Sequence, residues 1–94
     1  MNIDNIQQNI KSGYFSATQN ELEAGRITYF LQDDTKLVID HTEVSNAYGG
    51  RGLGKKLVFA VADYARANDL KIVPQCSFAK AVFDKTDEIK DLLV

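Results

Sequence analysis

The chain has 94 residues, of which 45% are hydrophobic and 26% are charged, and this composition predicts one ordinary globular domain over residues 1–94. Its formal net charge of −2 argues against a nucleic-acid-binding protein, which usually carries a basic surface. No apolar run approaches the roughly 20 residues that span a bilayer, so we expect no membrane partner. A single cysteine excludes an internal disulfide framework. With only one histidine besides, we expect no metal site.

The N-terminal segment, residues 1–12, has neither a basic n-region nor an apolar h-region. We therefore expect no signal peptide and a cytoplasmic location. Its isoleucines could form a helical stripe, but the segment is short and rich in asparagine and glutamine. We predict an extended lead-in here.

Three strands are predicted next, at Tyr14–Thr18, Arg26–Leu31 and Leu37–Ser45, because these segments are rich in aromatic and β-branched residues. Short polar turns separate them. Connections of this length favour antiparallel hairpins.

A helix over Leu53–Asn68 is the clearest element, since its apolar residues recur at helical spacing. The short strand Lys71–Pro74 follows it. Together with Leu37–Ser45, these segments predict a β-α-β crossover, which makes a parallel strand pair. Proline cannot donate to a sheet ladder, so the pairing should stop at Pro74.

The C-terminal part is predicted to contain two short helices. Ser77 is a plausible N-cap for a helix over Phe78–Asp84. A final helix is expected over Asp87–Leu93, which has acidic residues in its first turn, where the helix dipole favours them.

A glycine-rich stretch lies between the third strand and the long helix. Four of the chain's six glycines occur there, at Gly49, Gly50, Gly52 and Gly54. The first-turn amides of a helix have no intrahelical partner and carry partial positive charge, and glycine lets a ligand approach the backbone closely. The stretch therefore predicts a site for a phosphate-bearing ligand.

Two familiar phosphate loops fit this stretch only in part. Gly49–Lys55 matches the first seven positions of a P-loop, but Lys56 stands where a hydroxyl should bind Mg²⁺. A dinucleotide-binding loop would need a third glycine where Lys55 stands, and it would follow the first strand of a larger domain.

The stretch Val44–Gly54 resembles the acetyl-CoA pyrophosphate loop of the GNAT superfamily of N-acetyltransferases. The family pattern is Arg or Gln, two residues, Gly, any residue, then Gly or Ala. Gly52 and Gly54 occupy its glycine positions, whereas Gly49 stands where Arg or Gln is usual.

The resemblance continues downstream, where the spacing of a later family motif is occupied by Cys76, Ala79, Phe83, Asp84 and Lys85. Together with His41–Val44 and Val73–Phe78, these residues make the chain similar to the small, single-domain GNAT-like proteins, from about Tyr14 to Val94.

This resemblance implies an α+β fold of the minimal GNAT-like type. The sheet would be mixed and mostly antiparallel, with a parallel splayed strand pair and flanking helices. Acetyl-CoA would be the co-substrate, and the family places its oxyanion donor at the backbone amide of Val44. The residues expected to hold acetyl-CoA are Val44, Gly49, Gly50, Arg51, Gly52, Leu53, Gly54 and Lys55.

Three residues are candidates for the chemistry. His41 and Glu43, two apart on a predicted strand, could each act as the base that deprotonates an amine; alternatively, they only hydrogen-bond within the sheet or pair with a neighbouring cation. The usual acid is missing, because Phe83 has no proton to give. Cys76, just before a predicted helix, could accept the acetyl group or protonate CoA; alternatively, it is a small buried apolar residue.

The sequence thus predicts an acetyl-CoA-dependent N-acetyltransferase acting on an unidentified amine, either a small molecule or a protein. The alternative from a different class is a non-catalytic acyl-CoA-binding or regulatory module. A P-loop nucleotidase is a third, less well matched hypothesis.

Overall fold

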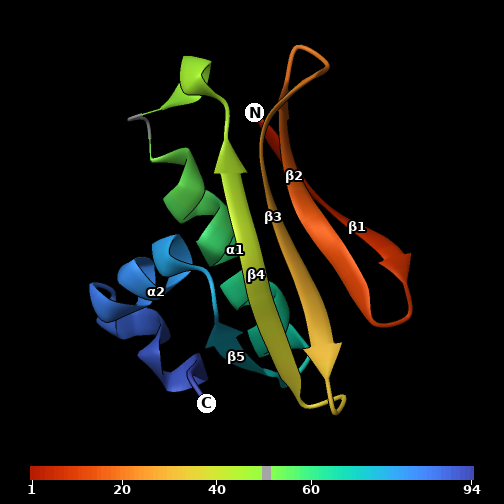
Figure 1. Ribbon diagram of the computed structural model, residues 1–94, viewed down its shortest axis with the longest axis vertical. Helices are drawn as coiled ribbons and strands as arrows, with labels where there is room; N and C mark the ends of the chain where they lie inside the picture. Colours follow the sequence, from red (N-terminus) through yellow and green to blue (C-terminus); the bar gives the residue numbers. More distant parts are fainter. Residues whose placement is uncertain (50–51) are drawn as a thin grey trace.

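The computed structural model describes residues 1–49 and 52–94, and Figure 1 shows a twisted sheet with helices behind it and at one edge. The sheet has five strands in the order β1-β2-β3-β4-β5. The strands are β1 (Asn2–Asn9), β2 (Ser12–Gln19), β3 (Leu22–Gln32), β4 (Lys36–Val44) and β5 (Lys71–Pro74). The helices are α1 (Leu53–Ala67) and α2 (Ser77–Asp84), with the 3₁₀ helices η1 (Asn46–Tyr48) and η2 (Asp87–Leu92).

The strands β1 to β4 pair with one another in antiparallel fashion, while β4 and β5 are parallel. The helix α1 makes the crossover between these two parallel strands. The predicted α+β fold, with a mixed and mostly antiparallel sheet, is therefore confirmed. No helix in residues 1–49 and 52–94 is long and apolar enough to cross a membrane. The cytoplasmic location stays a prediction.

The N-terminal segment is a full edge strand rather than a simple lead-in. Its strand β1 pairs with β2 along its whole length, from Asn2 opposite Thr18 to Asn9 opposite Ser12. Most of its side chains are exposed on both faces, so its sequence shows no apolar alternation. The Tyr29 hydroxyl donates to Asn5 Oδ1 at 2.9 Å and helps to hold β1 in the sheet.

The core lies between α1 and the back face of the sheet, the face turned away from the viewer in Figure 1. The helix α1 contributes the fully buried side chains of Leu57, Val58 and Val61. The sheet contributes those of Ile27 and Ile39, which are also fully buried. Burying one such side chain contributes roughly 1.5–3 kcal/mol, so this layer fixes where α1 begins relative to the end of β4. Among the described residues, no helix covers the opposite, front face of the sheet.

Two irregularities shape β4. Its register with β3 shifts between the pairs Thr28–His41 and Tyr29–Ile39, so Asp40 is the extra residue of a bulge. Its pairing with β5 ends at Ile39–Pro74, although β4 itself runs on to Val44. The backbone amides of residues 75 and 76 both donate to the Ile39 carbonyl, at 2.9 and 3.2 Å. Pro74 thus stops the ladder as predicted, and the part of β4 beyond it (Asp40–Val44) forms what we call the splayed edge.

The start of α2 differs from the prediction. Its N-cap is Cys76 and not Ser77, because the Cys76 backbone is extended (φ −79°, ψ 141°) and its Sγ accepts a hydrogen bond from the Ala79 amide at 3.3 Å. Ser77 is already the first helical residue. The final element is the 3₁₀ helix η2, which ends one residue earlier than expected.

Candidate functional site

The predicted glycine loop connects the splayed edge to α1, through η1. Gly52 is the N-cap of α1 and has φ of +73°, a left-handed conformation that glycine adopts without strain. No side chain caps this helix, and its first turn holds no acidic residue. The positive end of its dipole is therefore available to an anion. Gly50 and Arg51, also predicted to hold the ligand, lie outside the described residues.

A cavity of about 380 Å³ lies between this loop and α2, a size within the range of roughly 300–1,000 Å³ typical of ligand sites. Six of the eight residues expected to hold acetyl-CoA line it. The lining residues are Val44, Tyr48, Gly49, Gly52, Leu53, Gly54, Lys55, Phe78 and Val82. We call it the loop cavity.

Three of the lining residues were not predicted to hold the ligand: Tyr48 of η1, and the two α2 residues Phe78 and Val82. The latter two lie one turn apart on α2, and only their i, i+4 spacing hints at a shared face. Phe78 also explains Gly54, because a Cβ added there would lie 2.5 Å from Phe78 Cζ. The ring therefore packs directly on the first turn of α1 and forms part of the cavity wall.

The backbone direction at the end of β4 follows from one hydrogen bond. The Ser45 amide donates to the Ala24 carbonyl at 2.8 Å, which directs it toward β3. Because successive residues of a strand direct their amides to opposite edges, the Val44 amide is directed away from β3. It therefore faces the side that β5 leaves open, next to the loop cavity that Val44 lines.

The predicted catalytic residues fall on two faces of the sheet. His41 Nε2 lies 2.9 Å from Glu43 Oε1 on the front face, with 60% and 72% of the side chains exposed. Thr42, between them, points to the back face, where its Oγ1 lies 3.3 Å from Cys76 Sγ. The structure thus joins His41 with Glu43 and places Cys76 across the strand from them. The described residues contain no group of three or more His, Cys, Asp or Glu side chains that could hold a metal ion.

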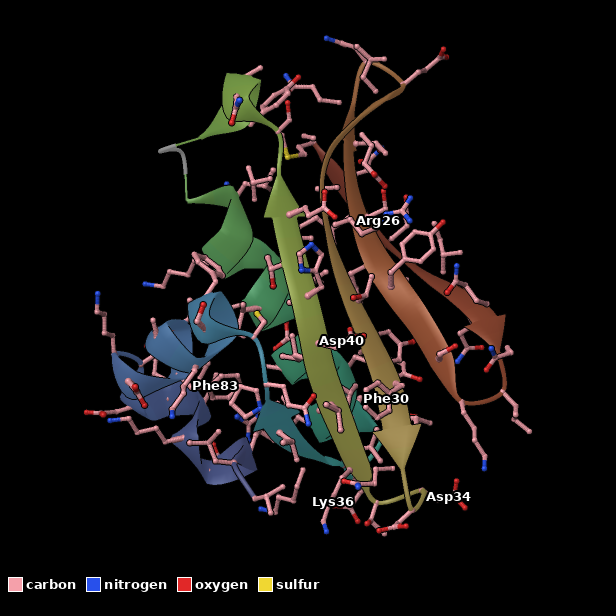
Figure 2. All side chains as sticks on the ribbon, viewed as in Figure 1. Arg26, Phe30, Asp34, Lys36, Asp40 and Phe83 are labelled. Atoms are coloured by element: carbon pink, nitrogen blue, oxygen red, sulfur yellow. The ribbon has the colours of Figure 1, made fainter. Side chains whose placement is uncertain are left out.

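A second cavity, of about 410 Å³, lies where β3 begins and β4 ends, and we call it the front cavity. It is lined by Glu23, Ala24, Gly25, Arg26, Glu43, Val44 and Ser45. Val44 also lines the loop cavity, so the two cavities share this residue. Figure 2 shows Arg26 on the front face, near the end of β4, with Asp40 and Phe30 farther down the sheet.

The ionic groups of the front cavity are held in place. Glu23 Oε2 accepts hydrogen bonds from Ser16 Oγ at 2.6 Å and from Arg26 Nη2 and Nε at 3.0 and 3.1 Å. The Ser16 hydrogen bond, and then the Arg26 guanidinium, lower the pKa of the Glu23 carboxyl. The Arg26 guanidinium carbon lies 3.8 Å from the centre of the Tyr14 ring. The sequence reasoning missed these residues, because they come together only through strand pairing.

The chain is similar to proteins of one family and to several solved structures. Residues 14–92 match the model of the GCN5-related N-acetyl-transferase family. Among solved structures, a GCN5-like protein from Staphylococcus aureus is 40% identical; the match covers 99% of this chain and 87% of that one, with a TM-score of 0.72. No curated protein matches the chain.

Two more distant structures share the fold. The ribosomal-protein-S18-alanine N-acetyltransferase from Escherichia coli is 19% identical, with a TM-score of 0.71 over 83% of this chain and 53% of that one. A GNAT family acetyltransferase from Elizabethkingia anophelis, solved with acetyl-CoA bound, is 18% identical, with a TM-score of 0.66 over 80% of this chain and 52% of that one. This chain thus spans about half the length of these two.

Proposed function

Because this chain belongs to the GCN5-related N-acetyl-transferase family, we propose that it binds acetyl-CoA and transfers the acetyl group to an amine. One observation carries the proposal: the loop cavity joins the uncapped, left-handed start of α1 at Gly52 to the amide of Val44 on the splayed edge. This arrangement offers an anion site at one end and a backbone hydrogen-bond donor at the other.

In this proposal, the pyrophosphate binds at the first turn of α1, with the Gly52–Lys55 amides as donors and the Lys55 side chain adding charge. Gly50 and Arg51 would contribute according to the sequence expectation. The largely apolar remainder of the loop cavity, including Phe78, would hold the pantetheine arm, so that the thioester reaches the splayed edge near Val44.

The transfer would proceed by attack of the amine nitrogen on the thioester carbon. The Val44 amide, directed to the open side of β4, would stabilise the oxyanion that develops. The carbon–sulfur bond then breaks and CoA leaves as a thiolate, which takes a proton from water; a thiol pKa near ~8.5 makes this leaving group acceptable. An alkylamine with a pKa near ~10.4 enters as an ammonium, so the His41–Glu43 pair would take its proton directly or through water.

Cys76 offers a second route at the same place. Its sulfur accepts a hydrogen bond from the Ala79 amide at the start of α2 and lies 3.3 Å from Thr42 Oγ1 on the splayed edge. A Cys76 thiolate could attack the thioester, forming an S-acetyl cysteine and releasing the CoA thiolate; the amine would then take the acetyl group. In the simpler route, the Cys76 thiol gives its proton to CoA.

A non-catalytic acyl-CoA-binding module is the second candidate. The position of the usual family acid is Phe83, which is fully buried in the core and has no proton to donate. The His41–Glu43 pair is also largely exposed and lies on the face opposite Cys76. Both observations are compatible with binding in the absence of turnover.

Calorimetric titration with acetyl-CoA, followed by a thiol-release assay on a panel of primary amines, separates these functions. The proposal predicts saturable binding and steady CoA release, with release reduced about 100- to 10,000-fold in His41→Gln or Glu43→Gln, as for loss of a general base. Binding without release from any amine would support the module. The absence of acetyl-CoA binding by a folded protein would contradict both.

Intact-mass analysis tests the Cys76 route separately. After brief incubation with acetyl-CoA, the covalent route predicts one acetyl group on the wild-type protein and none on Cys76→Ala. Turnover that persists in Cys76→Ser, without any adduct on the wild type, would leave only the direct route.

A further inference from the structure

We infer that the front cavity is the acceptor subsite, and that it selects small aliphatic primary amines that carry no carboxylate. This inference rests on the proposed acetyl transfer, because it names the amine. It is carried by three features of the described residues: the position of the cavity, its charge and the nature of its floor.

The front cavity lies next to the place proposed for the thioester. Val44 lines both the loop cavity and the front cavity. If the thioester lies beside the Val44 amide, an amine in the front cavity approaches the same point from the other face of β4. Glu43, the predicted base, also lines the front cavity and is held by His41 at 2.9 Å. The cavity therefore places an amine between the reacting carbon and the group that takes its proton.

The charge of the front cavity favours a cation. Three ionisable side chains line it, and two of them, Glu23 and Arg26, neutralise each other through two hydrogen bonds. Both are held further, Glu23 by Ser16 and Arg26 by the Tyr14 ring. The Glu43 carboxylate is the remaining charge among the lining side chains; its neighbour His41, 2.9 Å away, does not line the front cavity. These two carboxylates and one guanidinium leave a net charge of −1. An ammonium complements this negative charge, whereas a ligand carboxylate would be repelled by it.

The floor of the front cavity admits an aliphatic chain. It is formed by Ala24 and Gly25, where no long side chain projects. A Cβ added at Gly25 would lie 3.2 Å from Leu53 Cδ2 and 3.3 Å from Leu57 Cδ1, so it would point toward α1 on the back face, and only the backbone of this residue borders the front cavity. A volume of about 410 Å³ suits a small molecule and lies within the usual range of roughly 300–1,000 Å³.

The test compares n-butylamine with 4-aminobutanoate, which has the same number of carbon atoms and carries a carboxylate in place of the terminal methyl group. Each is titrated into the wild-type protein saturated with CoA, and the amide NMR signals of Gly25, Val44 and Ser45 are followed. We expect saturable shifts at these amides with n-butylamine and at least tenfold weaker binding of 4-aminobutanoate. The readout needs no turnover, so it does not depend on whether the protein is an active enzyme.

Variants on one face sharpen this test. Glu43→Gln should weaken n-butylamine binding about tenfold. Asp40→Asn is the matched control, because Asp40 lies on the same face but accepts a hydrogen bond from Thr28 at 2.6 Å and does not line the front cavity. It should leave the binding unchanged. If Glu43→Gln fails to fold, the comparison of the two ligands on the wild-type protein still decides.

Equal binding of the two compounds, or shifts confined to other parts of the chain, would overturn the inference. A separate titration with acetyl-CoA distinguishes this failure from that of the proposed function. Shifts at Gly52–Lys55 with acetyl-CoA, but none at Gly25 and Ser45 with the amine, would contradict the acceptor subsite alone. The absence of any response to acetyl-CoA would contradict the proposed function itself.

Discussion

The two halves of β4 differ sharply although they are one continuous strand. Leu37–Ile39 pairs with strands on both sides and is at most 1% exposed. Asp40–Val44 pairs only with β3 among the described strands, and its residues are half-buried or exposed. The bulge at Asp40 and the stop at Pro74 separate the halves. Packing thus stabilises the fold in the first half, whereas the second keeps its backbone amide and polar side chains available for a ligand.

The largest effect should come from the buried half. Ile39→Ala removes a fully buried side chain between the sheet and α1, and we expect it to lower the free energy of unfolding by about 2–5 kcal/mol. Ile39→Val should cost only about 0.5–1.5 kcal/mol, since most of the packing remains. Urea unfolding followed by circular dichroism measures both. A cost below about 1 kcal/mol for Ile39→Ala would show that this half is not the stabilising one.

The next effect concerns the packing under the second half. Gly25→Ala places a Cβ 3.0 Å from the Glu43 carbonyl oxygen, a backbone atom that cannot easily yield, and should destabilise the protein by about 1–3 kcal/mol. Gly49→Ala is the control, because its Cβ would meet its nearest atom at 3.5 Å and its φ is −61°. This change should stay within about 0.5 kcal/mol. Equal costs at the two glycines, measured by urea unfolding, would be inconsistent with the close approach at Gly25.

A smaller effect is expected where α2 begins beside the splayed edge. Cys76→Ala removes the sulfur that accepts the Ala79 amide, and loss of an N-cap acceptor typically costs about 0.5–2 kcal/mol. Cys76→Ser keeps an acceptor at this position, so its stability should be closer to that of the wild type. Thermal unfolding of the three proteins provides the comparison. If Ala and Ser are equivalent, the sulfur is not acting as a cap.

The smallest effect is electrostatic. The pKa of Glu23 is lowered from its usual value of 4.5, mainly by Ser16, so the folded protein binds a proton there less readily than the unfolded chain. The resulting stabilisation is present above about pH 4.5 and is lost as the pH falls through the lower folded-state pKa. It should amount to no more than about 1 kcal/mol, because the Glu23 side chain is 40% exposed.

Comparison of the wild type with Glu23→Gln at constant ionic strength tests this prediction. The difference in their free energies of unfolding should be present at about pH 6 and should shrink toward about pH 3. A difference that grows on acidification would have the wrong sign.

Much of the fold could be predicted, because its elements have local sequence patterns. Strands near β2, β3 and β4, the helix α1 and the strand β5 follow from alternation, helical spacing and proline. The edge strand β1 was missed as a sheet member because it is polar on both faces. The bulge at Asp40 was missed for a different reason, since it is a property of the register between β3 and β4.

The two cavities differ in the same way. The loop cavity could be largely predicted, since Gly49, Gly52 and Gly54 lie close together in the sequence and their spacing has a physical meaning. The front cavity could not, because Glu23 and Arg26 meet Glu43 only when the start of β3 pairs with the end of β4. A sequence without an alignment gives no sign of this long-range pairing.

Amide NMR during an acetyl-CoA titration tests the central claim most directly. We predict saturable shifts at Val44, Gly49 and Gly52–Lys55, weaker shifts with ATP at the same concentration, and little change at Leu37–Ile39 in the buried half of β4. A folded protein whose Val44 and Gly52–Lys55 amides do not respond to acetyl-CoA would contradict the account.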